Sequence, residues 1–547
     1  MTTIEVPILI AGGASVGLSL AADLGWRGVS CLVVEPRQTV NPHPRANAVG
    51  NRTMEYFRRW GVDLKLINKG IPADYPADYH WVSTLHGHRL HLLSLPSQAQ
   101  LEQARLAGRA DPRAEIYWSP YLKTICGQQH VEQALREYVA SRSGIDTRYG
   151  WELVDFEENE DHVLAEIRCL ADGKLVAVKC RYLVGCDGGQ STVRTRLGID
   201  MSGRSGLARF VSIYFRAPGM MKAHGFGHGN IYFPLHKAHR GFLLNWDTGI
   251  LWTYHKILNE GQEWTDVDPI EAVRGLVGSD IDVEVVELQP WTAHALVADR
   301  YSRGRVFMAG DAVHKFTPTG GLGMNTGISD AIDLGWKLAA VVKAWAPPAV
   351  LDSYHVERHP IGLRNTAEAA DNFDRLFSMM GYGDELDDEG PGGVKLRNEV
   401  AAELKTQEKL LASSGVLLGY RYSDSPLIVP DGTEEPPDNP RRYTPVARPG
   451  HRLPHLWLSP EVSVLDVLGP DFTLICCGGA TEAADVARVV AERMGVPLRI
   501  VQAGQPEVRD LYQADFVLVR PDMMVAWRGN NLSDIGVTLR RAIGAST

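Results

Sequence analysis

An aspartate followed by a glycine- and proline-rich loop offers the clearest chemistry in this sequence. Gly310 and Asp311 end the apolar run 306–309, which we expect to be a buried strand, and the loop 318–323 leads into a helical pattern over 325–340. The carboxylate can accept hydrogen bonds from the hydroxyls of a sugar-like chain, and the glycines allow the backbone to approach a ligand closely. The free N–H groups of the first helical turn favour negative charge. We therefore expect a charged, planar ligand here, the alternative being an ordinary strand–helix turn.

A second glycine-rich turn, near the N-terminus, is typical of dinucleotide binding. The apolar strand 6–11 precedes GGASVG at 12–17, and Glu35 ends the next predicted strand. In such a βαβ unit the turn admits a pyrophosphate at the helix start, and the acidic residue holds a ribose. Ala14 occupies the middle place of this fingerprint, so a methyl group stands where backbone normally approaches phosphate. Arg45 adds a cation nearby. An ordinary βαβ unit and a surface arginine are the alternatives.

Length and composition exclude several classes of protein. The chain has 547 residues, which predicts two or three domains, and its 44% hydrophobic and 22% charged content is that of a soluble globular protein. A net charge of −10 argues against nucleic acid as a partner. Seven scattered cysteines without a CxxC pair predict reduced thiols in the cytoplasm and no zinc. No signal peptide and no membrane-spanning run is visible.

Further elements must position these loops. The strand 181–186 ends at Asp187, and Gln128 begins the predicted helix 128–140. From 210 to 256 the pattern changes to aromatic-rich strands separated by turns, at 231–235, 242–246 and 251–255. This change predicts an antiparallel sheet inserted into the α/β domain. Its aromatic side chains could form core or wall a pocket for an aromatic ligand.

The C-terminal part reads as a separate unit. A proline-rich stretch at 430–454 looks like a linker. The predicted order beyond it is strand 472–477, helix 482–494, strand 498–501, the strand pair 516–520 and 525–528, and a last helix near 537–543. That is the order of a thioredoxin-like domain. Cys476 and Cys477 lie within a strand, which favours a place in the core over a redox role.

Three motifs together carry a resemblance to a known family. GGASVG at 12–17, CDGGQSTVR at 186–194 and GDAVHKFTPTGGLGMNTGISDA at 310–331 resemble the motifs of the class A flavoprotein aromatic hydroxylases. The chain is most similar to the phenol-hydroxylase branch with a C-terminal thioredoxin-like domain, which includes enzymes acting on chlorophenols, hydroxyphenylpropionates and polyketide phenols. The resemblance implies a Rossmann-like FAD-binding domain at 1–75, 111–200 and 300–375 and a mostly antiparallel β domain for the substrate at 76–110 and 201–299. The resemblance further implies a helical linker at 376–440 and a thioredoxin-like domain at 441–547.

The resemblance also implies a cofactor site and a reaction. The implied FAD-binding residues are Gly12, Ala14, Gly17, Glu35, Arg45, Gln128, Asp187, Asp311, Pro318, Gly321, Gly323, Met324 and Asn325. Asp311 would bind the ribityl chain, and the residues from Pro318 onward would line the isoalloxazine. Asp187 would also serve a transient NAD(P)H, although Gln190 replaces the arginine usual in the family. The implied reaction is hydroxylation of a phenolic substrate by a flavin C4a-hydroperoxide, with NAD(P)H and O2 consumed.

The proton acceptor for the phenol is the least defined part of this site. Asn47 aligns with an aspartate that p-hydroxybenzoate hydroxylase and phenol hydroxylase keep near the substrate, and an amide cannot take a proton. We expect Asn47 to orient the ring oxygen and the inserted sheet to supply the base. His236 is the first choice and Tyr232 the second, and His228 and Tyr254 are also within range.

Other functions remain open at this point. A Baeyer–Villiger oxygenase, a flavin dehydrogenase or a non-catalytic flavin-binding protein would carry the same motifs. A halogenase is disfavoured because its WxWxIP motif is missing. The expected partners are a small aromatic substrate and O2, with a homodimer as a possible assembly.

Overall fold

Five parallel strands organise the part of the chain that begins at the N-terminus. A computed structural model describes residues 3–67, 69–107, 118–407, 413–478 and 481–545. The path of this sheet is β16 (Ser302–Arg303), β17 (Val306–Met308), β10 (Leu175–Gly185), β1 (Thr3–Ala11), β2 (Cys31–Glu35) and β7 (Ile145–Tyr149). All neighbours from β17 to β7 are parallel, and β8 (Trp151–Glu158) and β9 (Val163–Cys169) add an antiparallel extension beside β10. The strands are apolar where both faces are covered, as a parallel sheet requires.

Helices cover this sheet and begin at its ligand-binding edge. α1 (Ser15–Trp26), α5 (Gln128–Ala140) and α9 (Gly323–Val342) belong to this domain. Nearly every residue of α9 is buried, including the charged Asp330, Asp333 and Lys337, which form ion pairs inside the protein. α2 (Asn51–Trp60) ends at Gly61, whose φ of 70° is the left-handed conformation that stops a helix.

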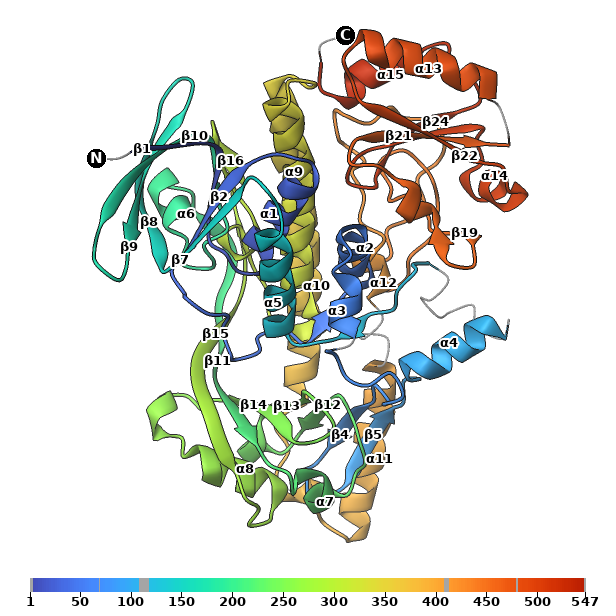
Figure 1. Cartoon of the computed structure of the whole chain (residues 1–547). Helices are drawn as coiled ribbons and strands as arrows, with labels where there is room; N and C mark the ends of the chain where they lie inside the picture. Colours follow the sequence, from blue (N-terminus) through green and yellow to red (C-terminus); the bar gives the residue numbers. More distant parts are fainter. Residues whose placement is uncertain (1–2, 68, 108–117, 408–412, 479–480, 546–547) are drawn as a thin grey trace.

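A second sheet lies below the first domain in Figure 1. Its strands, in spatial order, are β18 (His314–Lys315), β15 (Glu284–Ala298), β11 (Met201–Arg216), β14 (Leu251–Ile257), β13 (Gly241–Asn245), β12 (Ile231–Pro234), β4 (Tyr79–Val82) and β5 (Arg89–Leu93). All pairs except β12–β4 are antiparallel. Strands β11 and β15 are long and reach up to the first domain (Figure 1).

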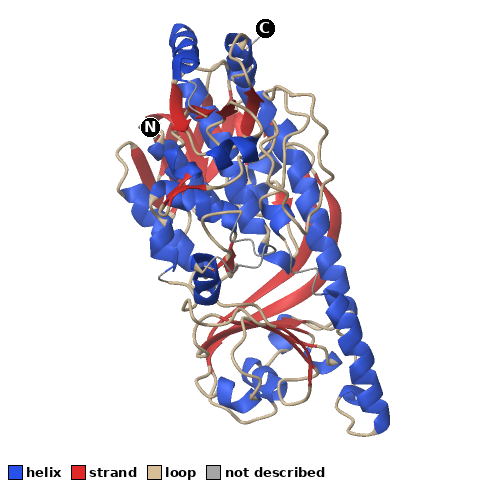
Figure 2. Ribbon diagram, turned by 90° about the vertical axis from the view of Figure 1, so that its right-hand side faces the viewer, coloured by secondary structure: helices blue, strands red, loops and turns tan. Residues whose placement is uncertain are grey.

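The two faces of this second sheet pack against different partners. One face carries Val211 and Ile213 and is covered by α7 (Met220–His224) and α8 (Pro269–Val277). These helices lie on the side away from α9, as Figures 1 and 2 show. The other face carries Phe210 and Phe242, and it meets the end of α10 (Ser353–Ser378) and α11 (Pro391–Gln407). We call the latter the inner face, because it looks toward the first domain.

The C-terminal domain has the predicted order of elements. Its sheet runs β22 (Leu498–Ala503), β21 (Phe472–Cys477), β23 (Phe516–Val519) and β24 (Val525–Gly529), with only β21 and β22 parallel. The helices are α13 (Thr481–Arg493), α14 (Pro506–Tyr512) and α15 (Ile535–Ala542). Cys476 and Cys477 are buried in β21. The predicted fold class is confirmed: a Rossmann-like α/β domain, an inserted mostly antiparallel sheet and a thioredoxin-like C-terminal domain.

Two details differ from the sequence-based expectation or lie beyond it. The stretch 430–454 is not a free linker, because Arg452 within it is buried and forms an ion pair with Glu55 of α2. The boundary placed between 110 and 111 lies outside the described residues. No helix in the described ranges is long and apolar enough to cross a membrane.

Candidate cofactor and substrate site

The three glycine-containing motifs meet at one edge of the parallel sheet. The N–H of Cys186, after β10, donates to the carbonyl of Ala11 at the end of β1, with an N···O distance of 2.7 Å. Gly12 has a φ of 104°, and a Cβ there would lie 2.2 Å from the Cys186 carbonyl oxygen. A Cβ on Gly17 would lie 1.9 Å from the carbonyl oxygen of Gly12. Both positions therefore require glycine, as the fingerprint predicts.

The third motif packs against the same turn. A Cβ on Gly310 would lie 2.9 Å from Cγ2 of Val16 in α1, and one on Gly327 would lie 2.9 Å from the Cα of Gly310. Asp330 of α9 holds this loop, because its carboxylate accepts hydrogen bonds from the Gly310 N–H at 3.2 Å and from His314 Nε2 at 2.7 Å. The loop with Asp311 is thus fixed beside the start of α1.

The polar groups around the first turn have defined partners. Glu35 at the end of β2 accepts the N–H of Gly13 at 2.7 Å and that of Arg37 at 3.0 Å. Gln128 Nε2 donates to Ser15 Oγ at 3.1 Å, which places Gln128 beside the start of α1. Ala14 has extended backbone with a φ of −86°, so its methyl group causes no strain in the turn itself.

Asp187 offers an acceptor without a partner. Its Oδ2 accepts the N–H of Val193 at 3.1 Å, whereas Oδ1 is buried and has no hydrogen bond within the described ranges. Burial raises the pKa of this carboxyl above its usual value. Arg194 donates to the carbonyls of Ala312 at 3.0 Å and Gly189 at 3.1 Å, and so ties the second motif to the third. A buried acceptor of this kind normally has a hydrogen-bond partner, and the hydroxyl of a bound ligand could serve as one.

Charged side chains surround the exposed Asp311. Burial lowers the pKa of Arg45 and of Lys315, and the carboxylate of Asp311 is close enough to both to raise these pKa values in turn. Neither α1 nor α9 has a side-chain cap at its N-terminus, so backbone N–H groups there are available to a ligand. Free N–H groups, cations and acceptors for hydroxyls together fit a dinucleotide such as FAD.

The side chain of Asn325, at the start of α9, is engaged by contacts within the protein, and its predicted place beside the flavin stays a prediction. Pro318 is exposed, Gly321, Gly323 and Met324 are half-buried, and Asn325 is buried. The Asn325 amide donates to the carbonyls of Ala48 at 3.0 Å and Gly321 at 2.7 Å, and it accepts from Gly50 and Thr53 at 2.8 and 2.7 Å. These four bonds use the amide fully, so Asn325 positions the loop against α2.

The predicted bases are not brought to the cofactor residues. Tyr232 is fully buried on the face covered by α7, and its hydroxyl donates to the carbonyl of Gly227 at 2.6 Å. His236 lies beyond the end of β12, with its Nε2 atom 3.1 Å from Oδ1 of Asp384. Asn47 is half-buried in the cofactor domain, where its side chain makes no hydrogen bond to any described residue.

The two further histidine and tyrosine candidates also lie elsewhere. Tyr254 is buried in the cluster beside α8, on the face away from the first domain. His228 Nε2 accepts a hydrogen bond from Asn245 Nδ2 at 3.0 Å, and the His228 ring packs edge-on against Tyr75.

Polar residues on the inner face were missed by sequence reasoning. Ser212 of β11 lies directly opposite His255 of β14, and Tyr214 is two residues further along the same face. His43, from the loop with Arg45, is only 3% exposed and contacts Tyr214 edge-on at a ring distance of 5.6 Å. The alternation of strand residues contained this signal, because His255 must face opposite to its neighbour Tyr254.

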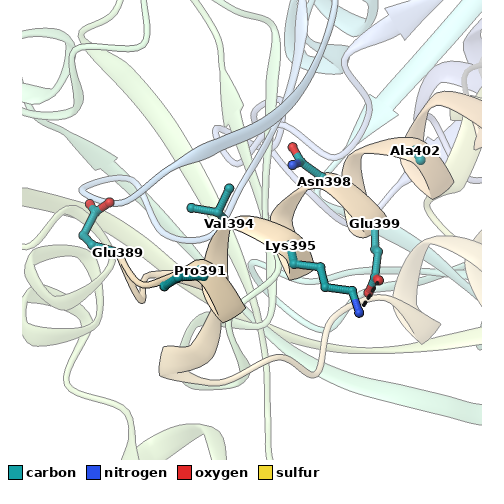
Figure 3. A pocket seen from close by; sticks show the side chains of 7 residues that line it. All are labelled: Glu389, Pro391, Val394, Lys395, Asn398, Glu399 and Ala402. Atoms are coloured by element: carbon teal, nitrogen blue, oxygen red, sulfur yellow. Dashed lines mark ion pairs between the residues drawn. The ribbon is translucent and has the colours of Figure 1, made fainter.

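The hollow drawn in Figure 3 lies elsewhere, on the outer surface of α11. Its lining residues are Glu389, Pro391, Val394, Lys395, Asn398, Glu399 and Ala402. None of the predicted site residues is among them, and Lys395 and Glu399 form an exposed ion pair within the helix. The hollow is therefore no part of the candidate site.

Comparison with known proteins gives the family. A profile described as "FAD binding domain" matches residues 5–369, and one described as "Aromatic-ring hydroxylase, C-terminal" matches 446–546. The chain is 32% identical to a 4-methyl-5-nitrocatechol 5-monooxygenase of Burkholderia sp, with 97% of this chain and 95% of the relative covered. It is also 32% identical to a tetracenomycin B2 monooxygenase-dioxygenase of Streptomyces olivaceus, over 98% of this chain and 97% of the relative.

A solved structure supports the same assignment. The rebeccamycin biosynthetic enzyme RebC with reduced flavin superposes with a TM-score of 0.90 at 36% identity, and each chain is covered completely, at 100%. The match extends over all three domains. On these findings the chain belongs to the FAD-dependent aromatic-ring hydroxylases, monooxygenases that use FAD and NAD(P)H.

Proposed function

We propose that this enzyme hydroxylates a phenolic ring that binds between the inner face of the sheet and the N-terminal end of α9. The observation that carries the proposal is the contact of the inner face with the cofactor loop. His43, two residues before Arg45, packs on Tyr214 of β11, and its Nδ1 is 3.5 Å from Glu287 of β15. An aromatic wall beside the cofactor residues suits a flat, apolar substrate.

The residues of this chain would hold, orient and shield the reactants. Bound FAD supplies the oxygen-transfer chemistry, at the expense of NAD(P)H and O2. Glu35 and Asp311 would accept the sugar-like hydroxyls, with Asp187 Oδ1 as a further acceptor. The first turn of α9 would stabilise negative charge on the adjacent ring system by up to ~2 kcal/mol. Phe210, Phe242 and their neighbours on the inner face would exclude water from the reacting atoms.

NAD(P)H would bind transiently, at no domain of its own. The chain contains no second dinucleotide fingerprint before an independent βαβ unit. We place the nicotinamide near Asp187 and Arg194, where the second and third motifs are tied together. Reduction should accelerate when a phenol is bound, since the substrate shifts the population of reactive arrangements.

The test is a screen of NAD(P)H consumption over simple and polycyclic phenols, with mass analysis of the products. We expect consumption to rise with a phenol present and the product to gain one oxygen atom on the ring. Oxygen insertion into a ketone substrate would instead favour a Baeyer–Villiger oxygenase. Consumption without any oxygenated product would favour a dehydrogenase and refute the proposal.

Assembly and location complete the proposal. All seven cysteines are free in the structure; six are buried and Cys169 is half-buried. Free thiols support action in the reducing cytoplasm. A homodimer remains a prediction, which light scattering on the purified enzyme would check.

A further inference from the structure

Three polar side chains form a hydrogen-bonded chain on the inner face. Trp291 Nε1 of β15 is 2.7 Å from Ser212 Oγ of β11, and His255 Nδ1 of β14 is 2.7 Å from the same oxygen. Ser212 is 1% and His255 6% exposed. The strand register explains the contact, since Ser212 and His255 are direct cross-strand partners.

Aromatic rings surround this chain on the same face. Phe242 stacks on the His255 ring at 4.4 Å, and Phe210 stacks on Trp291 at 4.1 Å with the planes 1° apart. His43 lies close enough to His255 for its charge to lower the pKa of His255 further, beyond the larger effect of burial. The His255 ring therefore has aromatic surroundings and lies close to the loop that carries His43 and Arg45.

The hydrogen bonds determine which nitrogen of His255 carries the proton. An indole N–H can only donate, so Ser212 Oγ accepts the bond from Trp291. The hydroxyl proton of Ser212 then needs an acceptor, and within the described ranges His255 Nδ1 is the atom placed to accept it. Nδ1 is thus unprotonated, and the proton of the neutral ring is on Nε2.

Nε2–H is consequently a donor without a partner. Nothing among the described residues accepts a hydrogen bond from it. Burial lowers the pKa of His255 to about 3, so the ring stays neutral at working pH. The imidazole therefore cannot act as the base, but it can donate to an oxygen atom of a bound molecule.

We propose that His255 Nε2–H donates a hydrogen bond to the ring oxygen of the substrate and favours its phenolate form. Ser212 and Trp291 act as positioning residues, since they hold the tautomer that makes this donor available. The inference rests on the proposed function and specifies its substrate: an aromatic ring with an ionisable hydroxyl, stacked beside Phe242. On this view the sheet supplies a hydrogen-bond donor, His255, in place of the base expected from the sequence. The proton of the phenol is then released to solvent.

The test uses 4-nitrocatechol with the FAD-loaded enzyme, because its phenolate absorbs visible light and reports ionisation directly. With the wild type we expect the bound probe to be more ionised than the free probe at the same pH. His255→Phe should weaken phenolate binding by roughly 10- to 100-fold, the range for one hydrogen bond to a charged group. His255→Gln keeps an N–H donor and should recover part of the loss, and Ser212→Ala should give an intermediate effect.

His80→Phe is the matched control. His80 is also a buried histidine of this sheet, but it stacks on Tyr232 on the opposite face at 4.7 Å. Its replacement should leave the phenolate band unchanged, and FAD absorbance should be unchanged in every variant. Equal affinity of the His255→Phe and His80→Phe enzymes for the probe would overturn the inference, as would a wild type that does not favour the phenolate.

The proposed function and the role of His255 can be refuted separately. If the phenolate band depends on His255 while no phenol is ever hydroxylated, the binding role stands and the proposed function is wrong. If phenols are hydroxylated and His255→Phe has a wild-type KM and kcat, the function stands and the role of His255 is wrong.

Discussion

Replacing Arg520 should destabilise the joint between the C-terminal and cofactor domains. Arg520 follows β23 and is 1% exposed. Its guanidinium donates to Glu357 at 2.5 and 2.9 Å, to Asp333 at 3.1 Å and to Asp522 at 2.7 and 3.2 Å. Lys337 of α9 completes the cluster, with Nζ 2.6 Å from Asp333 and 2.5 Å from Glu357. Three segments distant in sequence are thus joined by buried ion pairs.

The expected loss of stability follows from the charges that remain buried after Arg520 is replaced. The cluster contains two cations and three carboxylates, so Arg520→Met changes its formal charge from about −1 to about −2 without exposing it to water. Burial opposes the ionisation of Glu357, yet Arg520 and Lys337 hold the pKa of this carboxyl well below its usual range. Removing one partner of a buried pair typically costs about 3–5 kcal/mol, because the other charge stays buried and unpaired.

Thermal unfolding of the FAD-loaded enzyme measures the effect. At about 2–4 °C per kcal/mol, the melting temperature of Arg520→Met should fall by roughly 6–20 °C. The melting temperature of Arg520→Lys should lie between those of the wild type and Arg520→Met. Lysine keeps the charge but has only three donors for the five hydrogen bonds that Arg520 makes. Glu357→Gln in the Arg520→Met background should recover part of the loss, since it removes one unpaired charge.

The control is a surface pair in the same domain. Arg509 is 2.7 Å from Asp515, and the Arg509 side chain is 57% exposed. Exposed pairs contribute about 0–1 kcal/mol, so Arg509→Met should change the melting temperature little. A melting temperature for Arg520→Met equal to that of Arg509→Met would refute the view that this buried cluster stabilises the joint.

Three further predictions concern the cofactor and pH. Gly17→Ala should bind FAD at least roughly tenfold more weakly, because its Cβ would lie 1.9 Å from a backbone oxygen and the turn must shift; fluorescence titration of the apoenzyme measures this. Asp311→Ala should lose most of its FAD, by roughly 10- to 100-fold in affinity, and full occupancy after purification would show that Asp311 is not a cofactor ligand. Burial lowers the pKa of His43 and His224 to about 4 and of His255 to about 3, below the ordinary 6.5. Below pH 6.5 the unfolded chain therefore takes up protons that the folded chain does not, so the free energy of unfolding should decrease as the pH is lowered. The decrease should reach about 2 kcal/mol per histidine at pH 5. Equal midpoints of urea unfolding at pH 7.5 and pH 5 would contradict this prediction.

Much of the fold could be predicted because its signals are local. The helix 128–140 and the strand 472–477 appear in the structure with the predicted bounds, as α5 and β21. Apolar periodicity and turn residues involve only a few neighbouring positions, so these patterns can be recognised in the sequence alone. Gly17 could be predicted for a related reason, because its Cβ would meet the carbonyl oxygen of the nearby Gly12. Gly12 is required by the carbonyl oxygen of Cys186, which is distant in sequence, and the fingerprint pattern alone predicted it. Motif order then implied where the parts of the cofactor site would meet.

In the sheet domain, two features could be found only in the tertiary structure: the face on which each side chain lies and its cross-strand partner. A strand pattern tells which residues alternate, but not which face looks inward, and that depends on what covers each face. Tyr232 turned out to pack under α7, whereas His255, which the sequence did not single out, lies on the inner face beside Ser212. The cross-strand partner, set by register, decides whether a polar side chain has a free donor.

The long-range polar contacts were beyond the sequence for the same physical reason. Asn325 is predicted to line the flavin, and nothing in the sequence indicates that its side-chain amide accepts hydrogen bonds from Gly50 and Thr53, more than 270 positions away. No ion pair is predicted for Arg520 from the sequence, and its partners Asp333 and Glu357 lie on two different helices. Residue types and local periodicity determined the elements and the cofactor class of this protein. Which buried polar groups satisfy one another was decided only when those elements packed together, because each hydrogen bond depends on the positions of two distant segments.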